Sequence, residues 1–185
     1  MRVWIDPCNN YVFADVHGST RYLTRGRVPI RSKANRWIPV PGWTGEHDWN
    51  GWVPFEEKPH VLEPDRGYIA TANNAQSRDE AARLVTDNGW FGPYRAQRIS
   101  ELIEATEFHD AESLQAIQMH AGSAMASRYL PMAVEAFTAA GLGGMAQRLE
   151  AWDGSADLES TEATLFFTWW QTVRTLFMTD YYGGG

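Results

Sequence analysis

Apolar and polar residues alternate in two short segments near the N-terminus. Residues 11–16 (YVFADV) alternate with a period of two, and residues 20–24 (TRYLT) follow after the glycine-containing turn at 17–19 (HGS). Alternation around such a turn is typical of a β-hairpin. We therefore predict a hairpin, with Asn9 and Asn10 standing just before its first strand.

Residues 27–66 are rich in proline, glycine and tryptophan. The stretch RWIPVPGWTGEHDWNGWVPF at 36–55 holds four tryptophans, three prolines and three glycines. Loops this long are usually functional or disordered, but tryptophans favour order because they bury a large apolar area. We predict an ordered loop without regular structure, followed by one short strand at 67–71 (GYIAT).

The C-terminal half has the spacing of helices. Apolar residues recur at i, i+3 and i+4, most clearly at 165–177. Proline suits a first helical position, so we expect one helix to begin at Pro93 and another at Pro131, with further helices over 112–126 and 142–149. The chain is thus predicted to be α+β.

The sequence predicts two portions with different structure. Residues 1–91 form a strand-and-loop portion, and residues 92–185 form a helical portion, which we expect to be truncated at its C-terminus because YYGGG interrupts a strong helix. A chain of 185 residues with 44% hydrophobic residues is long enough for one ordinary domain with a core.

Charge and hydropathy exclude some partners. The net charge is −7, which argues against a nucleic-acid partner because phosphates need a basic face. The clustered arginines in an otherwise acidic chain also fit a solvated hairpin face: Arg21, Arg25, Arg27, Arg31 and Arg36. No run of about 18 apolar residues exists, so we predict no membrane span, and the N-terminus lacks the apolar core of an export signal.

Several kinds of chemistry have no motif here. The single cysteine, Cys8, excludes an internal disulfide and is interpreted as an incidental thiol. The five histidines lack metal-ligand spacing, and there is no phosphate loop, dinucleotide fingerprint or nucleophile elbow. We therefore predict neither a metal nor a cofactor.

Five further blocks follow one another along roughly residues 9–182: NNYVFADVHGSTRYLTRGRVPIR, PVPGWTGEHDWNGWVPF, GYIATANN, YRAQRISELI and LEAWDGSADLESTEATLFFTWW. In their residues and their order they resemble the penicillin acylase family of N-terminal-nucleophile hydrolases. The resemblance implies an internal fragment of the large chain of a four-layer αββα enzyme. It also implies hydrolysis of amide bonds in acylated small molecules, namely penicillins, cephalosporin side chains or acyl-homoserine lactones.

The resemblance implies roles for two residues near the N-terminus. Asn10 matches the asparagine whose side-chain amide binds the tetrahedral oxyanion. Asn9, one residue earlier, is the alternative match. A purely structural cap before the strand is the alternative role of Asn10. Arg31, in GRVPIR, matches an arginine that orients the polar network near the nucleophile, although a surface arginine is the alternative.

Two further parts of the chain are expected to support the site. Asn73 and Asn74 match the ATANN block and are interpreted as loop structure near the site. Within the aromatic loop, as we call residues 27–66, the stretch at 39–52 is expected to be a stiff platform whose tryptophans bury it against the sheet, holding Asn10 and Arg31 in place.

The departures from the family pattern define the remaining expectations. No catalytic serine aligns, so the nucleophile, the small chain and the N-terminal part of the large chain are expected outside this sequence, and the chain alone is expected to be inactive. Calcium ligands of the family lie mostly outside it as well. Family members are often periplasmic or secreted, but the compartment stays open. The alternatives are a non-catalytic binding module with a Trp-rich ligand loop and a non-functional fragment.

Overall fold

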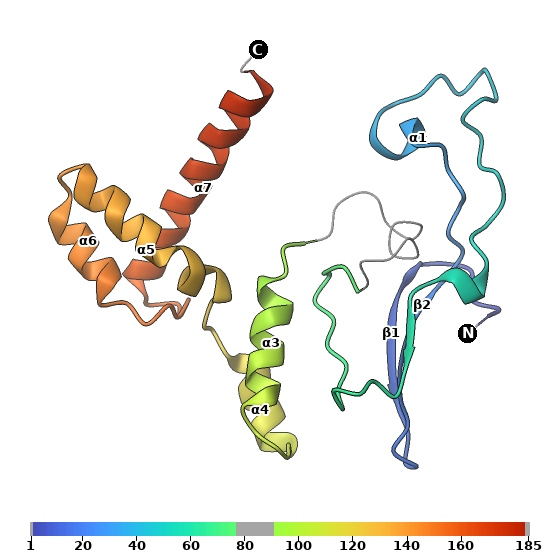
Figure 1. The fold of residues 1–185 in the computed structure, drawn as a ribbon, viewed down its shortest axis with the longest axis horizontal. Coiled ribbons are helices and arrows are strands. Elements are labelled where there is room, and N and C mark those ends of the chain that lie inside the picture. The colour runs from blue at the N-terminus through green and yellow to red at the C-terminus, as the bar shows by residue number, and fades with distance from the viewer. Residues whose placement is uncertain (1, 77–90, 184–185) are drawn as a thin grey trace. The chain divides into compact units, whose positions relative to one another are not determined.

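The computed structural model describes residues 2–76 and 91–183 of the chain. These residues belong to two compact units, Met1–Ala96 and Gln97–Gly185 (Figure 1). The boundary predicted at residues 91 and 92 stays a prediction. The first unit holds all the strands of the described part, and the second is helical, so the α+β class is confirmed.

The predicted hairpin is present. Strands β1 (Asn9–Ala14) and β2 (Thr20–Arg25) pair antiparallel. The Asp15 carboxylate accepts backbone hydrogen bonds from the turn, at 2.9 Å and 3.0 Å, which is the short-range bonding that favours aspartate in turns. The first strand begins earlier than predicted, so Asn9 and Asn10 lie within it rather than before it.

A third strand, β3 (His60–Leu62), pairs with the other side of β2 and gives the order β1-β2-β3. The prediction of a strand at 67–71 was wrong, since those residues have no strand structure. Backbone bonds from Thr24 N to the Pro59 carbonyl (3.0 Å) and from Glu63 N to the Thr20 carbonyl (2.8 Å) extend the pairing at both ends of β3. Its position is therefore fixed by β2.

The aromatic loop contains two short helices, α1 (Ala34–Trp37) and η1 (Phe55–Glu57). Its two arms are joined by an antiparallel bridge between Pro29 and Trp52, beside the buried pair Val28 and Val53. The loop is thus ordered, as predicted, and it has more regular structure than predicted.

The three tryptophans at 39–52 of this loop do not bury it, which corrects the predicted platform. Trp43 is 88% exposed, Trp49 is 59% exposed and Trp52 is 46% exposed. The loop is instead held by its backbone and by polar contacts, including the hydrogen bond from Asn35 Nδ2 to the His47 carbonyl at 2.8 Å. Aromatic content alone therefore gave the wrong burial.

Five helices form the C-terminal half of the described chain. They are α3 (Tyr94–Glu104), α4 (Ala111–Met119), α5 (Ala124–Ala139), α6 (Gly143–Glu150) and α7 (Thr161–Tyr182). No helix in the parts that the structure describes has the length and apolar content to cross a membrane.

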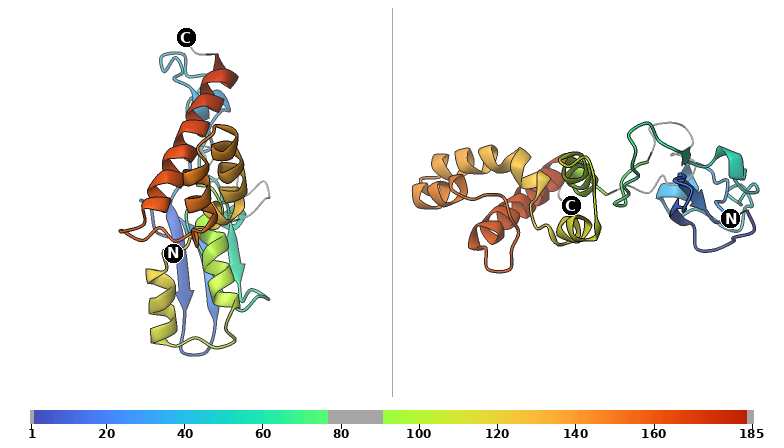
Figure 2. Two further views of the ribbon diagram at one scale, coloured as in Figure 1. Left: turned by 90° about the vertical axis from the view of Figure 1, so that its left-hand side faces the viewer. Right: turned by 90° about the horizontal axis from the view of Figure 1, so that it is seen from below.

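The core of the second unit lies between α5, α6 and α7, which pack side by side in Figures 1 and 2. Ala126 and Ala133 of α5, Leu149 of α6 and Phe166 of α7 are all 0% exposed. The two alanines let the neighbouring helices approach closely, while Leu149 and Phe166 are the largest fully buried side chains.

Pro131 lies inside α5 and does not open a helix as predicted. The helix begins earlier, because the Ser123 side chain caps it by accepting from Ala126 N at 3.2 Å. The helix predicted over 112–126 ends at Met119 instead. A proline within a helix costs one backbone hydrogen bond, and Ala126 and Ala133, on either side of Pro131, are both fully buried in the core.

Candidate functional site

Asn10 and Asn9 are neighbours on β1 and face opposite sides of the sheet. Asn9 is exposed, and its Oδ1 accepts a hydrogen bond from Arg25 Nε at 2.7 Å. Arg25 is in turn stacked over the rings of Trp4 and Tyr11, at 3.9 Å and 4.9 Å. Asn9 is therefore part of a surface cluster, whereas Asn10 is half-buried.

Asn10 faces two buried side chains of β2. Its Oδ1 accepts a hydrogen bond from the Tyr22 hydroxyl at 2.7 Å, and that hydroxyl lies 3.1 Å from Thr24 Oγ1. Tyr22 and Thr24 are each 2% exposed. Burial raises the pKa of Tyr22, with the Thr24 hydrogen bond opposing it, so the phenol stays protonated and can donate at neutral pH.

The sequence analysis did not single out Tyr22 or Thr24. The alternation in TRYLT places both on one face of β2. Their contact with Asn10 depends on the register, in which the Cα partner of Asn10 is Thr24. Register of a strand pair follows from the turn, and a turn one residue longer would have turned Asn10 away from them.

Arg31 follows the bridge that joins the two arms of the aromatic loop. The preceding residue, Ile30, is fixed by backbone hydrogen bonds to Gly51 (3.0 Å) and Asn50 (2.9 Å). Arg31 itself is half-buried. Within the described ranges its guanidinium has no hydrogen bond or ion pair, and no hydrogen bond joins it to Asn10. The structure therefore fixes its backbone but not a partner for its charge.

Asn73 and Asn74 shape the loop before α3. Asn73 has a positive φ of 58°, a conformation that asparagine tolerates better than most residues. Arg95 Nη2 donates to Asn73 Oδ1 and to the Ala72 carbonyl, both at 2.9 Å. Asn74 Oδ1 accepts from Ala72 N at 3.0 Å. Both asparagines thus stabilise the loop, and no described contact joins them to Asn10.

Lys58 is a buried charge that the sequence analysis missed. It is 6% exposed, and its Nζ donates to the Gly26 carbonyl. Partial burial raises the pKa of the nearby Cys8 thiol, and the charge of Lys58 opposes that rise. A thiol with a raised pKa stays protonated at neutral pH and is a poor nucleophile. The geometry therefore gives no support for catalysis by Cys8.

In the portion of the chain that the structure covers, no cluster of three or more His, Cys, Asp and Glu side chains could hold a metal ion.

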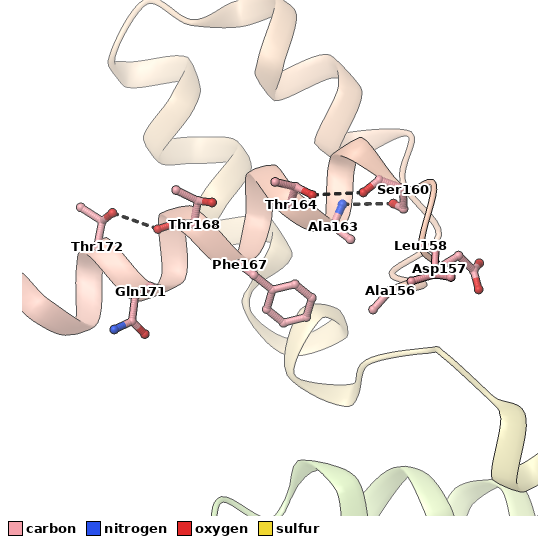
Figure 3. Close-up of a pocket in the computed structure, with 10 residues that line it drawn as sticks. All are labelled: Ala156, Asp157, Leu158, Ser160, Ala163, Thr164, Phe167, Thr168, Gln171 and Thr172. Atoms are coloured by element: carbon pink, nitrogen blue, oxygen red, sulfur yellow. Dashed lines mark hydrogen bonds between the residues drawn. The ribbon is translucent and has the colours of Figure 1, made fainter.

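Of two cavities in the described parts of the chain, one adjoins the tyrosine that bonds Asn10. It has a volume of about 430 Å³, lies on the sheet and is lined by residues that include Arg21, Tyr22 and His60. The other, of about 640 Å³, lies beside α7 in the second unit (Figure 3). Asn10 and Arg31 line neither of these cavities.

The cavity beside α7 offers little for chemistry. Two of its threonine hydroxyls bond back to carbonyls one turn earlier, Thr164 Oγ1 to Ser160 at 3.5 Å and Thr172 Oγ1 to Thr168 at 2.9 Å (Figure 3). The Asp157 carboxylate accepts from Ser155 Oγ at 2.7 Å. Among the described residues that line the cavity, Asp157 alone is ionisable, so we assign the cavity no reaction.

Comparison with known proteins gives one family. A family model described as penicillin amidase matches residues 1–183. The chain is 39% identical over 165 residues to the penicillin acylase 2 proenzyme of Pseudomonas sp. (strain SE83), covering 85% of this chain and 20% of that protein. It is 40% identical over 96 residues to penicillin G acylase of Escherichia coli, covering 51% of this chain and 11% of that protein.

Other relatives have a different name. The chain is 28% identical over 187 residues to the acyl-homoserine lactone acylase QuiP of Pseudomonas aeruginosa, covering 92% of this chain and 22% of that protein. Among solved structures, a thermostable penicillin G acylase from Alcaligenes faecalis matches with a TM-score of 0.64 at 20% identity, covering 83% of this chain and 28% of that one. The chain thus spans about a fifth of the length of these curated relatives.

Proposed function

This chain belongs to the penicillin amidase family, and we propose that it forms part of an amidohydrolase that cleaves the amide bond of acylated small molecules. The proposed substrates are penicillin or cephalosporin side chains and acyl-homoserine lactones, because the relatives are named as acylases of these two kinds. The proposed chemistry uses no metal and no cofactor.

The attacking group is an N-terminal serine that lies outside this chain. A terminal serine carries its own base, since a free α-amine has a pKa near 8 and can accept the hydroxyl proton. Attack on the amide carbonyl produces a tetrahedral oxyanion, and the base returns the proton to the leaving amine as the C–N bond breaks. Water then hydrolyses the acyl–serine ester through a second oxyanion, which releases the acid and the free serine. What the enzyme still requires is a fixed donor for the oxyanion.

Asn10 supplies that donor, and the orientation of its amide is the observation that carries the proposal. The Tyr22 hydroxyl donates to Oδ1, which leaves the Nδ2 hydrogens for another acceptor, and no described residue accepts from them. One preorganised donor of this kind stabilises the transition state by roughly 3 kcal/mol. Asn9 is less suited, because its amide oxygen is bound to Arg25 on the solvent side.

Arg31 is the second site residue in this proposal. Its positive charge near the serine amine would favour the neutral form of that amine, which is the form that acts as a base. Asn73 and Asn74 support the site indirectly, by fixing the loop that Arg95 anchors to the start of α3.

We propose that the chain acts together with regions that its relatives have and that it does not cover. These are the small chain and the N-terminal part of the large chain, which would carry the serine. The 185-residue chain alone is then inactive. If the isolated chain hydrolysed an amide substrate, this part of the proposal would be wrong.

The experiment measures amide hydrolysis by the complete protein that carries this chain. We expect it to hydrolyse a chromogenic phenylacetyl amide or an N-acyl-homoserine lactone, and the better substrate identifies the acyl class. Asn10→Ala should lower kcat by about 100- to 1,000-fold with little change in KM, because the donor acts in the transition state.

The matched control is Asn9→Ala, which removes the neighbouring amide from the opposite face of the same strand. We expect this variant to keep kcat within about threefold of the parent. If Asn9→Ala abolished hydrolysis and Asn10→Ala did not, the register alternative would replace Asn10 as the donor. If neither variant lowered kcat, the oxyanion role would be excluded for both.

A second candidate function rests on the exposed tryptophans. Trp49 and Trp52 stack edge to face with ring centroids 5.8 Å apart, and Trp43 is 88% exposed. Exposed aromatic rings suit a non-catalytic module that binds aromatic or sugar ligands. This function predicts that such a ligand quenches tryptophan fluorescence of the isolated chain, and that Trp43→Ala weakens the quenching. No quenching by either ligand class would reject it.

A further inference from the structure

Tyr22, Thr24 and Asn10 form a short chain of hydrogen bonds across the β1–β2 pair. The Tyr22 hydroxyl lies 2.7 Å from Asn10 Oδ1 and 3.1 Å from Thr24 Oγ1. Thr24 is also the Cα partner of Asn10 in the strand register. Three side chains from two strands are thus placed on one face of the sheet by pairing alone.

The hydrogen bonds among these three side chains have a preferred donor-to-acceptor direction. A phenol has one proton, and Tyr22 donates it to Asn10 Oδ1, so the Tyr22 oxygen accepts from the Thr24 hydroxyl. If the Asn10 amide were flipped, its NH₂ would donate to Tyr22, and Tyr22 would donate to Thr24. The proton of Thr24 would then need another acceptor, and Thr24 Oγ1 has no hydrogen bond to a described residue other than Tyr22.

Burial gives this direction its energetic weight. Tyr22 and Thr24 are each 2% exposed, so water cannot easily replace a lost partner. Leaving one buried donor unsatisfied costs about 1–3 kcal/mol. A penalty of this size biases the Asn10 amide strongly toward the orientation with Oδ1 on Tyr22 and Nδ2 turned away from it.

We propose that Tyr22 is a positioning residue: its hydroxyl, oriented by Thr24, holds the Asn10 amide with Nδ2 presented to the oxyanion. The inference rests on the proposed function of Asn10. It gives Tyr22 and Thr24, the two buried residues of β2, an effect on catalysis that they would not have if they only filled the core. Tyr22 touches no reacting atom and acts through Asn10.

The test is a double-mutant cycle in the complete protein, with hydrolysis of a chromogenic phenylacetyl amide or an N-acyl-homoserine lactone as readout. Tyr22→Phe removes the hydroxyl and keeps the ring. We expect kcat to fall about 5- to 20-fold with KM unchanged within twofold, the loss of one buried hydrogen bond acting in the transition state. In the Asn10→Ala background the same change should alter kcat less than twofold.

The outcomes separate positioning from structure. A structural effect of Tyr22→Phe would reduce kcat by the same factor in both backgrounds, and that result, or an unchanged kcat in the parent, overturns the inference. The matched control is Tyr11→Phe, which removes a hydroxyl from β1, where no described residue hydrogen-bonds it. It should leave kcat unchanged.

A second pair of variants covers the case in which Tyr22→Phe does not fold. Thr24→Val removes the hydroxyl that orients Tyr22, and Thr24→Ser keeps it. We expect kcat to fall about threefold or more in Thr24→Val and to recover in Thr24→Ser. Equal kcat in the two variants overturns the inference. If Asn10→Ala itself keeps the parental kcat, the proposed function fails together with the inference.

Discussion

Gly26 packs directly against the backbone of Cys8. A β-carbon on Gly26 would lie 2.5 Å from Cys8 Cα and 2.9 Å from Cys8 N. Its φ of +100° also lies in the region that L side chains rarely adopt. The carbonyl of the same glycine accepts from the buried Lys58 Nζ. Gly26 therefore joins the end of β2 to two other segments, which no larger residue could do without displacing one of them.

We expect Gly26→Ala to destabilise the β1–β2 unit by about 2–4 kcal/mol, from the strained backbone and the overlap with Cys8 together. The measurement is amide hydrogen exchange of peptides covering residues 9–25, which should become faster. Gly18→Ala is the control, because Gly18 also has a positive φ (87°) but no atom within 4 Å of an added β-carbon. Equal effects of the two substitutions would show that the contact with Cys8 is unimportant.

An element of the fold could be predicted from the sequence when the pattern that defines it lies within a few neighbouring residues. The hairpin was predicted because alternation and turn lie within a few residues. Strand β3 was missed because His60–Leu62 is too short to show a period and is defined by its pairing with β2. Pro131 was misread because a local rule for helix starts cannot anticipate a helix stabilised by Ser123 and by tertiary packing.

Replacing Leu149 is predicted to destabilise the helical unit much more than replacing an exposed leucine. It is 0% exposed and packs with Phe166, so Leu149→Ala should lower the free energy of unfolding by about 2–5 kcal/mol through lost burial and the resulting cavity. Leu158→Ala makes the same chemical change at a residue that is 101% exposed. Thermal unfolding should show a large shift for the first variant and almost none for the second. Similar shifts would contradict this core.

Glu162 is predicted to make the helical unit sensitive to acid. Arg148 donates to Glu162 Oε1 from Nε at 2.9 Å and from Nη2 at 2.7 Å, and these bonds hold the pKa of Glu162 below its usual range. A lowered folded pKa contributes stability that is present above the unfolded pKa of about 4.3 and is lost as the pH falls through the folded value.

Glu162→Gln should therefore flatten the fall in unfolding midpoint between about pH 5 and pH 3. Arg148 is exposed and Glu162 is half-buried, so solvent reaches the pair and its effect should also weaken in high salt. Glu159→Gln is the comparison, because the Glu159 carboxylate is exposed and makes no ion pair with a described residue. An unchanged pH profile in Glu162→Gln would mean that the ion pair does not contribute to stability.

The sequence could predict site residues whose own type carries the chemistry. It could not predict neighbours that act by orienting such a residue. Asn10 and Arg31 follow from the resemblance of their blocks, and their roles remain proposals. Tyr22 and Thr24 could not be found this way, because their contact with Asn10 requires the strand register. The exposure of Trp43 was also missed, since composition does not say which surface covers a ring.

Arg31 is predicted to set the pH at which kcat/KM falls on the acidic limb of the pH–activity profile. In the proposed mechanism the serine amine must be neutral, and a nearby positive charge disfavours its ammonium form and lowers its pKa. Removing the charge in Arg31→Ala should raise that pKa, so the acidic limb of kcat/KM should move to higher pH by about one unit. The measurement is kcat/KM of the complete protein between about pH 5 and pH 9.

Two further variants separate charge from geometry. Arg31→Lys keeps a positive charge but loses the planar guanidinium, so it should keep the limb near its parental pH while kcat falls. Arg27→Ala removes a neighbouring arginine that stacks over Trp52 with its guanidinium carbon 5.6 Å from the ring centroid, and it should leave the limb unchanged. If Arg27→Ala moved the limb as far as Arg31→Ala, the effect would come from the overall charge of this segment. Arg31 would then have no specific place beside the amine.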